Sequence, residues 1–120
     1  MKILVVDDDA MVVQAIKHSL NKEGYEVMIA CNGMEALGIF ENENIDLIIT
    51  DIMMPELSGL NLITFFREFH SIKIPIIIVS ALGKTNVIYP SLRMGANDFI
   101  IKPIDFALLS SSVKKHLNRC

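Results

Sequence analysis

Acidic side chains stand at two points of the sequence where a short apolar run ends. Three consecutive aspartates, Asp7–Asp9, follow the run Ile3–Val6. Asp51 follows a second such run, Leu47–Thr50. If the two sets meet, carboxylates about 4 Å apart repel by roughly 4 kcal/mol at an effective dielectric constant near 20, so the cluster would hold a proton or a cation. Mg²⁺ suits such a site, because it takes one or two carboxylates together with water and phosphate oxygens.

Two further polar residues stand at the ends of apolar runs. Ser80 ends the run that begins at Ile76, and Lys102 follows the run Phe99–Ile101. A lysine ammonium can pair with one phosphoryl oxygen, and a serine hydroxyl can donate to another. Asp51 could then act as a nucleophile that forms an acyl phosphate. The four run ends together therefore indicate phosphoryl chemistry.

Each of these residues also has an ordinary structural interpretation. Asp9, directly before Ala10, is equally suited to cap a helix, and a Lys-Pro pair after a strand is common in turns. A single serine at the end of a strand usually has no special role. What favours a functional site is the joint occurrence of such residues at four run ends.

The apolar runs alternate with stretches of helical spacing along the whole chain. This alternation predicts five strand–helix units, and continuously apolar strands are typical of a parallel sheet buried on both faces. We therefore expect one α/β domain over residues 1–120. Because right-handed crossovers point all the strands the same way, the polar run ends should meet at one edge of the sheet. The predicted strands are Ile3–Val6, Val27–Ile29, Leu47–Thr50, Ile76–Ser80 and Phe99–Ile101.

The ends of the predicted helices are marked by residues that cap or terminate helices. The fourth helix is the exception, because Pro90 lies inside the stretch Asn86–Met94 and lacks an N–H. We expect that helix to be short, kinked or to begin at Pro90. The boundary residues are Gly24, Asn32, Gly33, Ser58 and Asp105. The apolar positions expected to face the sheet are Val12, Ile16, Leu20, Leu62, Phe66, Phe69, Phe106, Leu109, Val113 and Leu117.

The composition excludes several classes of protein. A chain of 120 residues with 52% hydrophobic residues forms one packed domain and is not disordered. No apolar run reaches the roughly 18 residues of a membrane span, and Asp7–Asp9 interrupt any signal peptide, so we expect a cytoplasmic protein. A net charge of -3 argues against direct nucleic-acid binding. Cys31 and Cys120 lack the spacing of a disulfide framework or zinc site, and the three histidines, His116 included, are expected at exposed helix positions.

Over essentially its whole length the sequence resembles the receiver domain of two-component response regulators. Asp7 and Asp8 stand where that family has an acidic pair after the first strand. Asp51, with Met-Pro ending at Pro55 and then Gly59, resembles the segment around the phosphoaccepting aspartate.

The resemblance continues in the second half of the chain. Ser80, followed by Ala81, resembles the conserved hydroxyl of the family. Lys102 and Pro103 resemble its Lys-Pro pair, whose peptide bond is cis. Since only about 5–6% of X-Pro bonds in folded proteins are cis, this implies a specific structural feature.

The resemblance implies a fold and a reaction. The fold is a doubly wound, flavodoxin-like α/β sheet with strand order 2-1-3-4-5 and helices on both faces. Mg²⁺ would be held by Asp8, Asp51 and the backbone carbonyl of Met53, with Asp7 acting mainly through water. A sensor histidine kinase or a histidine phosphotransfer protein would pass its phosphoryl group to Asp51, with help from Lys102. The domain would assist its own phosphorylation and dephosphorylation without turning over a separate substrate.

The resemblance also implies a switch and a partner surface. The hydroxyl of Ser80 would move toward the phosphoryl group, and the ring of Phe99 would rotate into the vacated space. The face made by the fourth helix, the fifth strand and the fifth helix would then bind a downstream effector, an output domain or a second copy of the chain. Two residues depart from the family pattern: Phe99 stands where tyrosine is common, and Ile104 where phenylalanine often follows Lys-Pro.

Three other functions remain as alternatives. A haloacid dehalogenase-type phosphohydrolase also uses an aspartate and Mg²⁺, but the residues after Asp7 lack its pattern and 120 residues leave no cap domain. A flavin carrier would share the sheet, but Asp7–Asp9 would repel the flavin phosphate. A receiver that only docks, without phosphorylation, is disfavoured because every chemical position is filled.

Overall fold

The computed structural model describes residues 1–52, 59–69, 73–81 and 85–117. Its five strands form one parallel sheet in the order β2-β1-β3-β4-β5, as the sequence predicts. None of the helices in this described part has the length and apolarity that a membrane crossing requires. The elements are β1 Lys2–Val6, α1 Ala10–Lys22, β2 Glu26–Ala30, α2 Gly33–Asn42, β3 Leu47–Thr50, α3 Gly59–Thr64, the π-helix η1 Phe65–Phe69, β4 Ile76–Ser80, α4 Thr85–Met94, β5 Asp98–Ile101 and α5 Phe106–Leu117.

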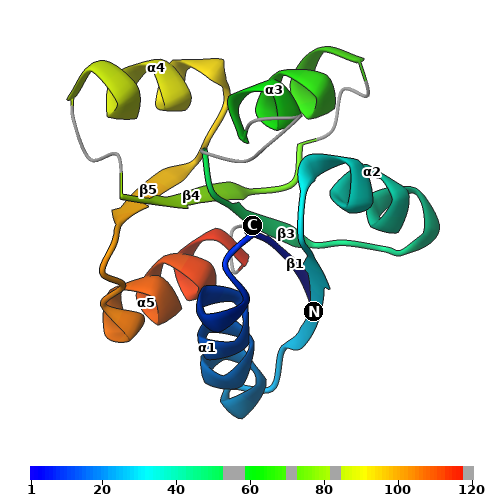
Figure 1. Cartoon of the computed structure of the whole chain (residues 1–120), viewed down its shortest axis with the longest axis vertical. Helices are drawn as coiled ribbons and strands as arrows, with labels where there is room; N and C mark the ends of the chain where they lie inside the picture. Colours follow the sequence, from blue (N-terminus) through cyan, green and yellow to red (C-terminus); the bar gives the residue numbers. More distant parts are fainter. Residues whose placement is uncertain (53–58, 70–72, 82–84, 118–120) are drawn as a thin grey trace.

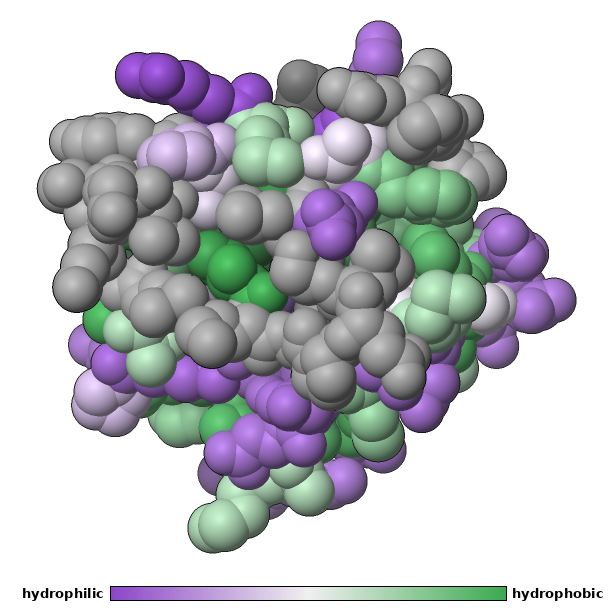
Figure 2. Space-filling view, turned by 45° about the horizontal axis from the view of Figure 1, so that its top comes forward, coloured by the Kyte–Doolittle hydropathy of each residue, from purple (hydrophilic) through white to green (hydrophobic). Residues whose placement is uncertain are grey.

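The helices cover both faces of the sheet. Helices α1 and α5 lie on one face, and α2, α3 and α4 lie on the other (Figure 1). Because successive strand residues point to opposite faces, Ile3 and Val5 of β1 pack toward α1 and α5, whereas Leu4 and Val6 pack in the second apolar cluster. One buried cluster lies on each face of the sheet, so the strand residues are buried on both faces, which explains the continuously apolar strands. Figure 2 shows one outer face, on which hydrophilic residues lie mainly toward the rim and hydrophobic residues are visible between them, some of them at the surface.

Capping residues set most of the helix ends where the sequence predicts them. Asp9 is the N-cap of α1, and its carboxylate accepts the amide of Met11 at 2.9 Å. Asn32 caps α2 in the same way, and Asp105 accepts amides in the first turn of α5. Gly24 ends α1 with a φ of +91°, a conformation that favours glycine. Ser58 lies outside the described residues.

The bounds of helix α4 exclude one of the three alternatives expected for it. It begins at Thr85 and runs through Pro90 to Met94, so the expectation of a start at Pro90 is wrong. A proline at this position cannot donate a hydrogen bond to the carbonyl of Asn86, yet the helix continues beyond it to Met94. The helix also buries Ser91 completely against the rest of the domain.

The exposure of two side chains of α5 differs from the prediction. Phe106 is 37% exposed and does not pack on the sheet, because it is the first residue of the helix and lines a groove of about 310 Å³ with Met11 and Pro103. His116, expected at the surface, is only 7% exposed, because it lies on the same helix face as Leu109 and Val113. His18 is exposed as expected, Cys31 is an exposed free cysteine, and His70 and Cys120 lie outside the described residues.

Arg67 of η1 connects this helix to the segments that lead into β4 and β5. Its guanidinium donates to the backbone carbonyl of Ile74 at 2.8 Å, to that of Gly95 at 3.0 Å, and to the side chain of Asn97 at 3.1 Å. Gly95 ends α4 with a φ of +124°, and a Cβ there would lie 2.8 Å from Cγ of Arg67. The end of α4 therefore needs both the backbone freedom and the small size of glycine.

Gly95→Ala should lower the free energy of unfolding by about 1–3 kcal/mol, because alanine adds a left-handed backbone strain and a clash with Arg67. Urea unfolding followed by circular dichroism would measure it. Gly38→Ala is the matched control: Gly38 lies within α2 with open space around it, so alanine there should raise stability by about 0.5–1 kcal/mol. Equal effects at the two sites would contradict this explanation.

Candidate functional site

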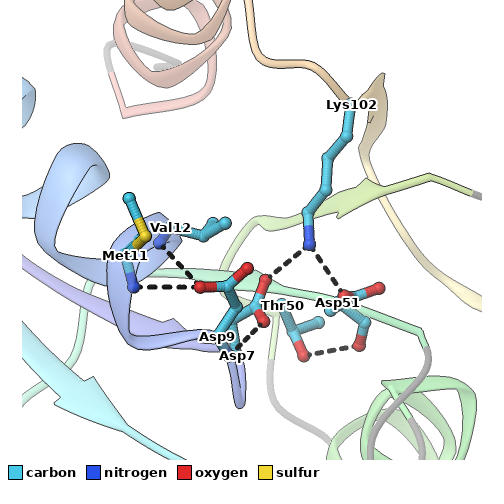
Figure 3. Close-up of polar contacts among 7 residues, drawn as sticks. All are labelled: Asp7, Asp9, Met11, Val12, Thr50, Asp51 and Lys102. Carbon is cyan, nitrogen blue, oxygen red and sulfur yellow. Dashed lines mark hydrogen bonds and ion pairs between the residues drawn. The ribbon is translucent and has the colours of Figure 1, made fainter.

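The predicted residues from three strand ends meet at one edge of the sheet. Asp7 follows β1, Asp51 follows β3 and Lys102 follows β5. The ammonium nitrogen of Lys102 lies 2.8 Å from Oδ2 of Asp7 and 2.9 Å from Oδ2 of Asp51 (Figure 3). One positive charge thus bridges two carboxylates that are 95 and 51 residues away in sequence.

Backbone hydrogen bonds that continue the sheet hold these residues in place. The amide of Asp51 donates to the carbonyl of Val6 at 3.1 Å, and the amide of Lys102 donates to the carbonyl of Ser80 at 2.9 Å. The amide of Asp7 donates to the carbonyl of Ala30 at 3.2 Å. Each side chain therefore projects from a backbone position that the neighbouring strand fixes.

The carboxylates of Asp7 and Asp51 are buried, and burial acts on the pKa values of Asp7 and Lys102. Burial raises the pKa of Asp7, which is 4% exposed, although hydrogen bonds from Lys102 and from the amide of Asp9 act in the opposite direction. For Lys102, burial alone would lower the pKa, but the hydrogen bonds and the charges of Asp7 and Asp51 outweigh it and raise the pKa. The lysine consequently stays charged at neutral pH.

The other predicted metal ligands occupy different environments. Asp8 is exposed in the loop after β1, and Asp9 is engaged in capping α1. Met53 lies outside the described residues. Among the residues that are described, no three His, Cys, Asp or Glu side chains group closely enough to form a metal site by themselves. The donors that do converge, Asp7 and Asp51, are hard carboxylate oxygens of the kind that Mg²⁺ prefers.

Ser80 and Phe99, the two predicted switch residues, lie on the neighbouring strands β4 and β5. Ser80 is buried at the end of β4, directly across from Ile101 of β5. Phe99 is half-buried and packs against the apolar cluster under α2, α3 and α4. The Lys102–Pro103 peptide bond is cis, as the sequence predicts.

Sequence reasoning missed Thr50. Its hydroxyl, at the end of β3, donates to the backbone carbonyl of Asp51 at 3.0 Å (Figure 3). The signal was present, because Thr50 is the single polar residue of the strand Leu47–Thr50.

Comparison with known proteins identifies the family of the chain. A family model described as the response regulator receiver domain matches residues 3–114, which is most of the chain. The chain belongs to this family.

Curated relatives of this receiver are longer proteins. The chain is 37% identical over 118 residues to a probable transcriptional regulator, ycf27, from Cyanophora paradoxa, which covers 98% of the chain and 48% of that protein. It is 35% identical over 119 residues to response regulator RR06 of Streptococcus pneumoniae, covering 99% of the chain and 54% of that protein. The receiver therefore spans about half the length of these relatives.

Solved structures match the receiver along nearly its full length. The receiver domain of Francisella response regulator 1452 superposes with a TM-score of 0.93 at 36% identity, covering 98% of this chain and 97% of that chain. The chemotaxis protein CheY4 of Vibrio cholerae gives a TM-score of 0.89 at 28% identity, with 96% and 97% covered. These matches confirm the doubly wound fold.

Asp7→Asn should raise the free energy of unfolding at pH 7 in the absence of divalent cations. Because burial raises the pKa of Asp7, the folded state loses stability as the pH rises through that pKa and the carboxylate ionises. The amide cannot ionise, and Lys102 keeps Asp51 as a partner. Urea unfolding at pH 7 and near pH 4 would test this.

The gain should shrink toward pH 4, where the wild-type carboxylate takes up its proton. Asp8→Asn is the matched control, because Asp8 is exposed and its substitution should change stability by less than about 0.5 kcal/mol. A lower stability of Asp7→Asn at pH 7 would show that the ion pair with Lys102 outweighs the cost of burial.

Proposed function

We propose that residues 1–120 form one receiver domain in which Asp51 accepts a phosphoryl group from a sensor histidine kinase or a histidine phosphotransfer protein. The observation that carries this proposal is the contact of Lys102 with both Asp7 and Asp51 at the carboxyl edge of the sheet. A buried aspartate beside a lysine that is charged at neutral pH provides a nucleophile and a partner for phosphoryl oxygens in one place.

In this reaction a carboxylate oxygen of Asp51 attacks phosphorus as the P–N bond of the donor phosphohistidine breaks. The imidazole keeps the electron pair of that bond, and Asp51 becomes an acyl phosphate. Lys102 is placed to pair with a phosphoryl oxygen, and the hydroxyl of Ser80 to donate to another. Little covalent chemistry is required of the protein beyond this positioning.

The converging carboxylates fit a magnesium ion. Asp8, Asp51 and the backbone carbonyl of Met53 would hold it, with Asp7 acting mainly through water. When bound, Mg²⁺ supplies neutralisation of the charge on the phosphoryl oxygens. Asp7 and Asp51 would each exchange part of their contact with Lys102 for the metal, which frees the ammonium for the phosphoryl group.

The output is carried by a change on the α4-β5-α5 face. Ser80 would move toward the phosphoryl group, and Phe99 would rotate into the space. Exposed apolar side chains of this face, Leu92, Ile101 and Leu108, support a protein partner there. That partner is a downstream effector, an output domain or, after phosphorylation, a second copy of the chain. We place the domain in the cytoplasm and expect no turnover of a separate substrate.

Incubation with acetyl phosphate and Mg²⁺ should add one phosphoryl group to the intact chain, and Asp51→Asn should abolish the adduct. Intact-mass spectrometry with and without EDTA measures both. The matched control is Asp46→Asn, because Asp46 accepts the amide of Lys2 near the opposite edge of the sheet. Adduct formation on Asp51→Asn at the wild-type rate would refute the assignment of the phosphoacceptor.

A further inference from the structure

Thr50 is a polar residue in an apolar place. It is 1% exposed and pairs in register with Val6 of β1 on one side and with Ile78 of β4 on the other. Both neighbours belong to the apolar cluster under α2, α3 and α4. A buried hydroxyl costs free energy unless it is hydrogen-bonded, and valine would fill the same volume without that cost.

The hydroxyl of Thr50 bonds to the main chain of the next residue. Its Oγ1 donates to the carbonyl oxygen of Asp51 at 3.0 Å, just where β3 ends. On its other side, the amide of Asp51 donates to the carbonyl of Val6 at 3.1 Å. The main chain of Asp51 is therefore held at both its amide and its carbonyl.

Holding the carbonyl has a consequence for the carboxylate. The orientation of the peptide plane after Asp51 fixes the ψ angle of this residue, and the side chain leaves from the same Cα. Oδ2 of Asp51 reaches the ammonium of Lys102 at 2.9 Å from that position. In group-transfer reactions a displacement of about 1 Å can cost on the order of 100-fold in rate.

We infer that Thr50 is a positioning residue for the phosphorylation of Asp51. Its hydroxyl fixes the backbone of Asp51 so that the carboxylate faces the incoming phosphorus, and it takes no part in bond making itself. This inference rests on the proposed function of Asp51.

Two substitutions in the full chain separate the hydroxyl from the packing of its methyl group. Thr50→Val keeps the shape and removes the hydroxyl, whereas Thr50→Ser keeps the hydroxyl and removes the methyl group. The time course of phosphorylation by acetyl phosphate with MgCl₂ is followed by intact mass. We expect Thr50→Val to lower the maximal rate by about tenfold or more, with little change in the half-saturating acetyl phosphate concentration.

The stability of the two variants is the second readout. If Thr50 had only a structural role, the less stable variant would also be the slower one to be phosphorylated. We expect Thr50→Ser to phosphorylate within about threefold of the wild-type rate yet to unfold at a lower urea concentration, because it loses a buried methyl group. Thr50→Val should be at least as stable as Thr50→Ser while reacting more slowly. Thr50→Ser should therefore be the faster of the two variants, and Thr50→Val at least as stable.

Each outcome decides the inference. Thr50→Val reacting at the wild-type rate would overturn it, and so would Thr50→Ser reacting as slowly as Thr50→Val, since the methyl group would then be what matters. An absent adduct on the wild-type chain would instead overturn the proposed function of Asp51, and the inference with it.

Discussion

The contact of one ammonium group with two buried carboxylates is the constraint on which this domain is organised. Without Lys102, the negative charges of Asp7 and Asp51 would lie close together in a region of low dielectric constant, where their repulsion is several times stronger than in water. The ion pairs can form only if β1, β3 and β5 end at the same edge, which the parallel order of the sheet ensures. The same arrangement places one positive and two negative charges at one edge of the sheet, where they suit the phosphoryl group and the metal ion of the proposed reaction.

The fold followed from the sequence because its strands are runs of apolar residues with clear ends. The predicted bounds of Leu47–Thr50 and Ile76–Ser80 are the observed ones. The first and fifth strands begin one residue earlier than predicted, and the second is one residue longer at each end. Runs buried on both faces leave little freedom in where a strand starts or stops. The convergence of Asp7, Asp51 and Lys102 followed in turn, since it needs only the direction of the strands.

What the sequence did not reveal depends on packing between elements. His116 reads as a surface residue by its polarity, yet it lies in the buried stripe of α5 beside Val113. Phe106 reads as a core residue by its hydrophobicity, yet the first turn of α5 holds it over a groove beside Pro103. Thr50 was overlooked although it is the single polar residue of its strand, because the sequence does not show the acceptor of its hydroxyl, the carbonyl of Asp51.

The register of the sheet aligns a row of side chains that contains Thr50 and Phe99 across all five strands. The row consists of successive partners on β2, β1, β3, β4 and β5, namely Ala30, Val6, Thr50, Ile78 and Phe99. Protein interiors are close-packed, so the summed volume of such a row is nearly fixed. A larger side chain at Ile78, between Thr50 and Phe99, would therefore require a smaller one at a neighbouring position of the row. If this row couples phosphorylation to the output, the sizes of the side chains at Thr50, Ile78 and Phe99 should vary together among receivers, without any one residue type being required.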